Sequence, residues 1–163
     1  MKTLTNTKES GFEEFIEAEL VKMHGYRARV ASAYERQLAM DTELVLEFVQ
    51  NTQPEEWKRL EEQYDDEVAG KFLTRLDEEV TERGLLAVLQ DGITDRGVRI
   101  IMAFRKPEND KNPETVADYG GNILSVMRQV KYSTKNENSI DTVLFINGLP
   151  LFTVELKNQF TGQ

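Results

Sequence analysis

The sequence contains no cysteine and only one histidine, His24. The lack of cysteine excludes disulfide bonds, cysteine-ligated zinc and thiol catalysis, and a single histidine excludes a histidine-rich metal site. His24 ends a predicted helix, where the helix dipole favours a cation, so a capping role accounts for it better than catalysis. No apolar run has the length of a membrane helix, and the first ten residues are too polar for a signal peptide. We therefore expect a cytoplasmic protein without membrane contact.

Basic residues are also scarce, because the net charge of the 163-residue chain is −9. Residues 1–95 hold 11 Lys or Arg against 22 Asp or Glu, whereas residues 96–163 hold 9 against 7. A protein that grips duplex DNA unaided usually presents a basic surface. Any DNA contact is therefore expected in the second half, with weak binding by the isolated chain. No glycine-rich loop followed by Lys-Ser or Lys-Thr occurs, which excludes a P-loop ATP site.

The N-terminal part has helical periodicity. Residues 9–24 predict an amphipathic helix that ends before Gly25, with an inward stripe formed by Phe12, Phe15, Ile16, Leu20 and Met23. Asp41 is a candidate cap for a helix over residues 42–50, Pro54 opens a second helix, and residues 68–83 predict a third. We interpret residues 41–82 as a helical insertion that could dock another domain.

Strand patterns dominate the rest of the chain. A short helix over residues 85–89 is followed by a predicted strand at 98–104 and another at 123–132. In the second of these strands Gln129 and Lys131 share a face, where they could touch a phosphate, support neighbouring acids or be plain surface residues.

Residues 141–157 predict a β-hairpin with an acid at the outer end of each arm. The turn decides whether these acids meet, because opposite residues share a face. A two-residue turn at Asn147-Gly148 would place Val154 opposite Asp141, whereas a loop of three or five residues would place Glu155 there. We expect the odd-numbered loop, which brings Asp141 and Glu155 together.

Two converging carboxylates suit Mg²⁺, which takes one or two carboxylates and keeps several waters. Lys157, two residues beyond Glu155, could position or help deprotonate an attacking water, and the backbone carbonyl of Leu156 is a further possible ligand. A surface Glu-Lys pair on an amphipathic hairpin is the alternative reading of the same spacing.

The amino-acid sequence of this stretch resembles that of a known family. Ser139-Ile-Asp141, the run Val143 to Pro150 with its Asn-Gly-Leu-Pro turn, and Val154-Glu155-Leu-Lys157-Asn158 are similar to the N-terminal nuclease region of the R (HsdR) subunit of type I restriction enzymes. Ile140 stands where many such nucleases have proline. The resemblance extends more thinly to residues 122–132 and to the opening helix. There it points to Glu13 as an acid near the metal, with a solvated glutamate as the alternative.

The resemblance implies an α/β fold with a restriction-endonuclease-like core of the PD-(D/E)XK class: a helix and a mixed, mainly antiparallel sheet with the catalytic hairpin near its middle. It implies one partial nuclease domain over residues 1–163 with the helical insertion, truncated after the hairpin and lacking motor and C-terminal regions. By the same resemblance, Asp141, Glu155 and Lys157 are catalytic and Asp141, Glu155 and the Leu156 carbonyl hold Mg²⁺. Possible supporting residues are Glu13, Gln129 and Lys131.

The implied activity is Mg²⁺-dependent cleavage of double-stranded DNA, in the full enzyme after ATP-driven translocation by the absent motor domains. The implied partners are DNA and the methyltransferase and specificity subunits. Two other readings stay open. One is a repair or junction-resolving nuclease of the same core, which the acidic charge disfavours. The other is a non-catalytic docking or assembly module.

Overall fold

A computed structural model describes residues 4–64 and 66–157, with side chains from Ser10 onward. These residues form helices, a mixed four-stranded sheet and two small two-stranded sheets, which is the predicted α/β class. The chain divides into two compact units, Met1–Met40 with Leu124–Gln163, and Asp41–Ile123. None of the described helices is long and apolar enough to cross a membrane.

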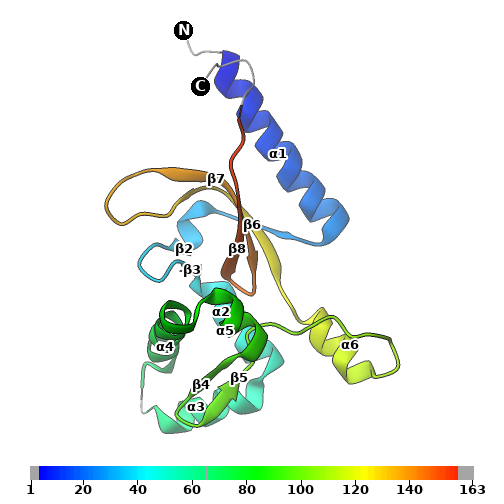
Figure 1. Cartoon of the computed structure of the whole chain (residues 1–163), viewed down its shortest axis with the longest axis vertical. Coiled ribbons are helices and arrows are strands. Elements are labelled where there is room, and N and C mark those ends of the chain that lie inside the picture. The colour runs from blue at the N-terminus through cyan, green and yellow to red at the C-terminus, as the bar shows by residue number, and fades with distance from the viewer. Residues whose placement is uncertain (1–3, 65, 158–163) are drawn as a thin grey trace. The chain divides into compact units, whose positions relative to one another are not determined.

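The first unit is built on the four-stranded sheet, in the order β1-β6-β7-β8. Figure 1 labels β6, β7 and β8 of this sheet. β1 runs parallel to β6, and the other pairs are antiparallel. Helix α1 contacts β1 and β6. The unit's elements are α1 (Leu4–His24), β1 (Arg27–Arg29), the 3-10 helix η1 (Ala31–Ala33), β2 (Tyr34–Glu35), β3 (Met40–Asp41), β6 (Leu124–Lys131), β7 (Ser139–Ile146) and β8 (Leu149–Val154). β3 extends by one residue into the second unit.

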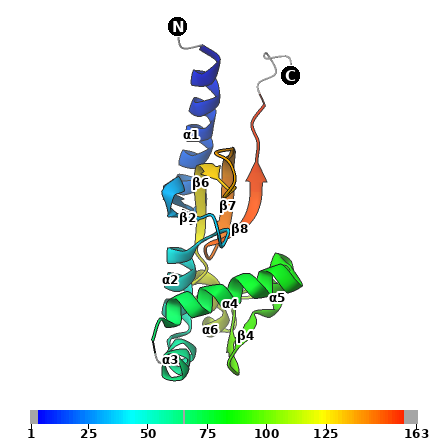
Figure 2. The ribbon, with the colours of Figure 1, turned by 90° about the vertical axis from the view of Figure 1, so that its left-hand side faces the viewer.

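The hairpin β7–β8 was expected near the middle of the sheet, and this is wrong for the described strands. β8 pairs with β7 alone and forms the edge of the sheet (Figure 2). The sheet is nevertheless mixed and mainly antiparallel, as predicted.

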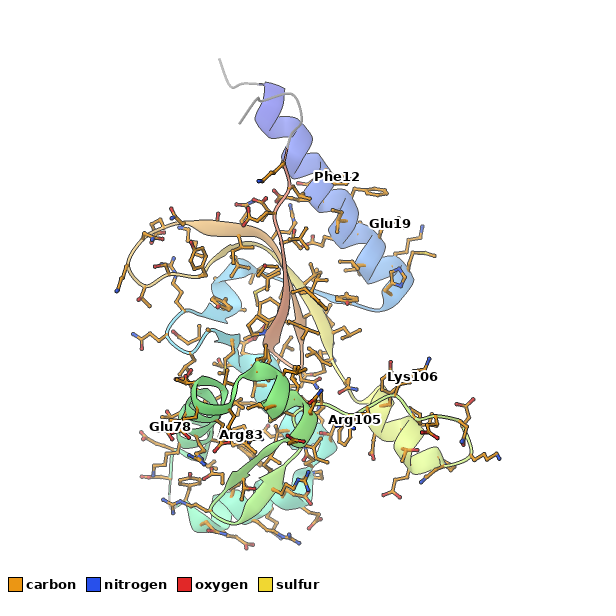
Figure 3. All side chains as sticks on the ribbon, in the orientation of Figure 1. Phe12, Glu19, Glu78, Arg83, Arg105 and Lys106 are labelled. Atoms are coloured by element: carbon orange, nitrogen blue, oxygen red, sulfur yellow. The ribbon has the colours of Figure 1, made fainter. Side chains whose placement is uncertain are left out.

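Helix α1 presents the predicted face only in part: Ile16 and Leu20 are half-buried, but the three larger residues of the stripe are exposed. Phe12, Phe15 and Met23 are 53%, 59% and 63% exposed, whereas Glu13 is only 5% exposed. Figure 3 shows Phe12 on the side of α1 turned away from the strands. Polar contacts account for this orientation. Arg128 and Gln129 of β6 donate hydrogen bonds to the carboxylates of Glu17 and Glu13, which turns this side of the helix toward the sheet. The end of α1 is as predicted, with Gly25 at φ +69°.

The core of the first unit lies on the other side of β6 and β7. Met127, Val130, Val143 and Phe145 form it, and Tyr34 and Ile140 pack against it. The Tyr34 ring meets the Phe145 ring edge-on, with 6.1 Å between centroids. Burial raises the pKa of the Tyr34 hydroxyl.

The hairpin turn has two residues, so the prediction of an odd-numbered loop is wrong. Ile146 pairs with Leu149, and Asn147 and Gly148 have φ +50° and +81°, the left-handed pair of a type I′ turn. The register then shifts, because Phe145 pairs with Pro150 while Leu144 pairs with Phe152. Leu151 is therefore the extra residue of a β-bulge. Pro150 lies next to this bulge on the edge strand, where proline is tolerated because no N–H is needed for the ladder.

The second unit begins with the predicted helices. Asp41 caps α2 (Thr42–Thr52) by accepting from the Leu44 backbone N–H at 3.3 Å, and Pro54 opens α3 (Pro54–Gln63). α4 (Val68–Arg83) has the predicted bounds, and α5 (Leu85–Asp91) ends before Gly92. The prediction of these helices is confirmed. They could be predicted because caps and apolar periodicity are local signals. The remaining elements are β4 (Ile93–Asp95), β5 (Val98–Ile100) and α6 (Pro113–Gly120).

β5 ends earlier than the strand predicted for residues 98–104. Beyond Ile100, the Gln53 amide accepts from the Ile101 N–H at 2.7 Å and donates to the Ile101 carbonyl at 2.9 Å. The Asn122 amide binds Phe104 in the same two-way manner, at 3.0 and 2.8 Å. Side-chain amides therefore satisfy the backbone groups that a neighbouring strand would otherwise pair.

Candidate functional site

The open end of the hairpin brings the predicted acids into register. The last β7–β8 pair is Thr142 with Val154, so Asp141 and Glu155 each lie one residue beyond it, at the open end of the hairpin. The Leu156 backbone N–H donates to Asp141 Oδ2 at 2.7 Å, which shows that the segment after β8 runs beside this aspartate. Asp141 is half-buried, and Glu155 and Lys157 are exposed. The bulge adds the one residue by which the expected odd-numbered loop differs from the observed two-residue turn.

Gln129 joins Asp141 to a third acid. Its Nε2 lies 3.0 and 3.1 Å from the two carboxylate oxygens of Glu13 and 3.5 Å from Asp141 Oδ1. Its Oε1 accepts from the Ser139 hydroxyl at 2.9 Å. These contacts fix the orientation of the amide, because ionised carboxylates only accept hydrogen bonds and must face the nitrogen. Glu13 is therefore the buried member of a polar network whose central residue, Gln129, is exposed, and the reading of Glu13 as a solvated glutamate is wrong.

The strand is irregular where this network forms. Gln129 has φ +54°, which is unusual for a residue other than glycine, although the register on either side of it is unbroken. Its neighbour Arg128 also reaches α1, with Nε 3.1 Å from Glu17 Oε2. Adjacent residues of a regular strand point to opposite faces, so this side-by-side arrangement marks a break in the alternation.

The core residues show the same break on the other face. Met127 and Val130 are three positions apart, yet both belong to one cluster, and Val143 and Ile140 repeat this spacing on β7. The alternation therefore changes phase on both strands at the level where Gln129 lies across from Asp141. This change allows Gln129 to reach both Asp141 and Glu13.

The charge of Glu13 is only weakly compensated. Its described partner is the neutral amide of Gln129, whereas the nearby cation Arg128 pairs with Glu17 and Glu14. A buried carboxylate ordinarily has a cation or a bound metal beside it. Among residues 10–64 and 66–157, no lysine or arginine makes an ion pair with Glu13. A cation at this place would therefore be favoured.

Lys131 does not join the acids. It forms an ion pair with Glu137, which also binds Arg36 at 3.1 Å. Hydrogen bonds from Arg36 and then Lys131 lower the pKa of Glu137 to about 2. These exposed contacts lie at the connection between β6 and β7. Among the described contacts, Lys131 therefore makes none with Asp141, Glu155 or Glu13 that would support the role suggested for it.

The family described as the type I restriction enzyme R protein N terminus matches residues 6–163. The chain belongs to this family. Comparisons with curated proteins and with solved structures each returned no match. The family match runs through residues 28–82, where the sequence carries none of the motifs that suggested the resemblance.

The donor set of this R-subunit region fits a hard cation in kind. Asp141 and Glu155 offer carboxylate oxygens, the Leu156 carbonyl lies between Glu155 and Lys157 in the chain, and Glu13 adds a carboxylate that shares Gln129 with Asp141. Magnesium commonly takes one or two carboxylates and keeps several waters. Within the described residues, no three acidic or histidine side chains are already gathered as a ligand set. The two carboxylates around Gln129 are compatible with the smaller requirement of magnesium.

The sequence did not predict the roles of two residues in this R-subunit region. Ser139 orients the Gln129 amide, and Arg128 ties β6 to α1. The signal for Arg128 was two long polar residues in succession in a strand that otherwise alternates. No comparable signal marked Ser139, because its role depends on the turned backbone of Gln129.

Proposed function

We propose that this R-subunit region is a Mg²⁺-dependent endonuclease that hydrolyses phosphodiester bonds of double-stranded DNA. The observation that supports it is the hydrogen bond from the Leu156 N–H to Asp141 Oδ2 just beyond the last hairpin pair, Thr142 with Val154; continuing that register by one step would set Glu155 opposite Asp141. Asp141, Glu155 and the Leu156 carbonyl are the proposed metal ligands, and Lys157 is the proposed water-positioning residue.

The residues have separate tasks in this proposal. The Leu156 N–H orients the Asp141 carboxylate, so that Oδ1 is directed to the side of Glu13 and Gln129. Lys157 lies two residues beyond Glu155 and is exposed, which allows its ammonium group to reach a phosphate oxygen or the attacking water. Bound Mg²⁺ would supply the positive charge that stabilises the phosphoryl oxygens as negative charge develops on them.

In the whole enzyme, we propose that this region acts together with methyltransferase and specificity subunits. Its ATP dependence would come through motor domains outside these 163 residues, because the sequence has no P-loop motif. Family membership supports this assignment.

The first test is a calorimetric titration with Mn²⁺ and Mg²⁺, with plasmid nicking read in the same buffers. Asp141→Ala and Glu155→Ala should each weaken metal binding at least about tenfold, because each removes one charged ligand. Glu19→Ala is the matched control, because Glu19 is exposed on α1 away from the strands (Figure 3). It should bind metal like the wild type.

The proposal has a clear point of failure. Full cleavage by Asp141→Ala would end it, since the proposal makes Asp141 a metal ligand. Equal losses in Glu19→Ala and Glu155→Ala would instead indicate a general effect of negative charge without a site at the hairpin.

A further inference from the structure

The Gln129 amide lies between the carboxylates of Glu13 and Asp141, where two negative charges would favour a cation. One nitrogen contacts both oxygens of buried Glu13 and, at 3.5 Å, an oxygen of Asp141. We propose that Gln129 is a positioning residue that stands in for the metal: its amide keeps the two carboxylates together in the metal-free protein and is displaced when the cation binds. This inference rests on the proposed metal site.

The arrangement reduces repulsion between two anions. An N–H donor that faces two carboxylates carries only partial positive charge, so it stabilises the pair less than an ion would. The oxygens that it engages are the hard donors that Mg²⁺ prefers. The amide is therefore strong enough to organise the site and weak enough to be replaced.

The backbone indicates that this contact is specifically maintained. Gln129 adopts a left-handed conformation inside a strand, which costs free energy for a side chain with a Cβ. In return, both ends of its amide are used, the nitrogen by Glu13 and Asp141 and the oxygen by Ser139. Gln129 is exposed, and without these contacts it would gain nothing from the strained conformation.

The test uses substitutions at Gln129 that change the charge in opposite directions. Gln129→Lys puts a permanent ammonium group between the carboxylates, so Mn²⁺ binding should weaken at least about tenfold while the metal-free Tm stays equal or rises. Gln129→Glu adds a third carboxylate, so the metal-free Tm should fall and Mn²⁺ should bind about tenfold more tightly. Calorimetry and thermal unfolding with and without Mn²⁺ supply the two readouts.

Two further variants complete the design. Gln129→Met keeps the size of the side chain and removes its donors, so it should lower the metal-free Tm and enlarge the Mn²⁺-induced rise. This variant decides the matter if Gln129→Lys does not fold. Gln37→Lys is the charge control, because Gln37 is exposed in the same unit. It should bind Mn²⁺ like the wild type.

The outcomes separate this inference from the proposed function. If the wild type binds Mn²⁺ and all three Gln129 variants bind it equally well, the stand-in role is overturned and the proposed metal site remains. If the wild type binds no Mn²⁺, both are overturned. A purely structural role would lower the Tm in every Gln129 variant without moving metal affinity in opposite directions for lysine and glutamate.

Discussion

At the scale of single residues, Glu79 and Glu13 are buried carboxylates in contrasting surroundings. Glu79 accepts from Arg75 and, at 2.7 Å, from Arg83, whose guanidinium also donates to the Gly92 carbonyl. Among the described residues, Glu13 has only the Gln129 amide as a hydrogen-bond partner. The paired acid holds the second unit together, whereas the weakly paired acid leaves a place for a ligand.

Glu79→Gln tests the first role. Hydrogen bonding from Arg83 lowers the pKa of Glu79, and this outweighs the rise caused by its burial. We expect a loss of about 2 kcal/mol in the free energy of unfolding at neutral pH, reduced from a fully buried ion pair because both arginines are partly exposed. Urea denaturation measures it, with Glu78→Gln at the exposed neighbour as the control and a loss of about 0.5 kcal/mol or less.

The same pair of proteins tests the sign of the pH dependence. Because the folded pKa lies below the ordinary value of 4.5, the contribution of Glu79 is complete above that value and is lost as the pH falls toward the folded pKa. The difference in stability between wild type and Glu79→Gln should therefore shrink in acid. A difference that stays constant down to the folded pKa would contradict the assignment.

Single-residue predictions succeeded where the cause is local. Asp41 and Gly25 act through the few residues that follow or precede them, so their roles at helix ends could be predicted. The burial of Glu13 could not, because it depends on the backbone of Gln129, 116 positions further along the chain. Apolar periodicity predicted the orientation of α1 only in part, since it assigns no weight to a specific carboxylate contact.

At the scale of elements, the connection between α5 and β4 depends on a close approach of two backbones. Gly92 has φ +70°, and a Cβ added there would lie 2.3 Å from the Ile100 carbonyl oxygen. Gly97, in the turn between β4 and β5, has a similar φ of +79° but open space around it. The two glycines share the conformational requirement and differ in the available space.

Alanine at these glycines should therefore have unequal effects. Gly97→Ala should cost about 1 kcal/mol from its left-handed backbone alone. Gly92→Ala should cost at least about 2 kcal/mol more, because the β4–β5 pair must move to admit the methyl group. Thermal and urea unfolding of both variants provide the comparison. Equal losses would show that the contact with Ile100 relaxes freely.

Elements that depend on pairing partners were harder to predict than helices. The bounds of α4 follow from its own apolar spacing, whereas β5 ends where Gln53 and Asn122 take over its backbone groups. Pro150 was the available signal for the bulge in β8, because proline inside a strand favours an edge or a bulge. Interpreted as part of the turn, it led to the wrong loop length.

At the scale of the whole molecule, the two units differ sharply in charge. Asp41–Ile123 holds 20 Asp or Glu against 10 Lys or Arg, whereas the rest of the chain holds 9 against 10. Several cations of the first unit are already paired, including Arg128 with Glu17 and Arg36 with Glu137. Few positive charges are therefore left to bind phosphates.

Duplex DNA binding should accordingly be weak and only mildly dependent on salt. Because each phosphate contact contributes about −0.9 to the slope of log affinity against log salt, we expect a slope no steeper than about −3. Fluorescence anisotropy with labelled duplex across a salt series measures it. A slope of about −6 or steeper would require a basic surface that the described ion pairs do not leave.

The bulge at Leu151 also determines which changes in chain length the hairpin tolerates. With a two-residue turn and one extra residue, Thr142 pairs with Val154, and continuing this register by one step would set Asp141 and Glu155 face to face. Insertions or deletions of two residues preserve this arrangement, and those of one reverse it. Natural or engineered variants of this hairpin should therefore differ in length by an even number of residues if Asp141 and Glu155 are both to keep their place in the site.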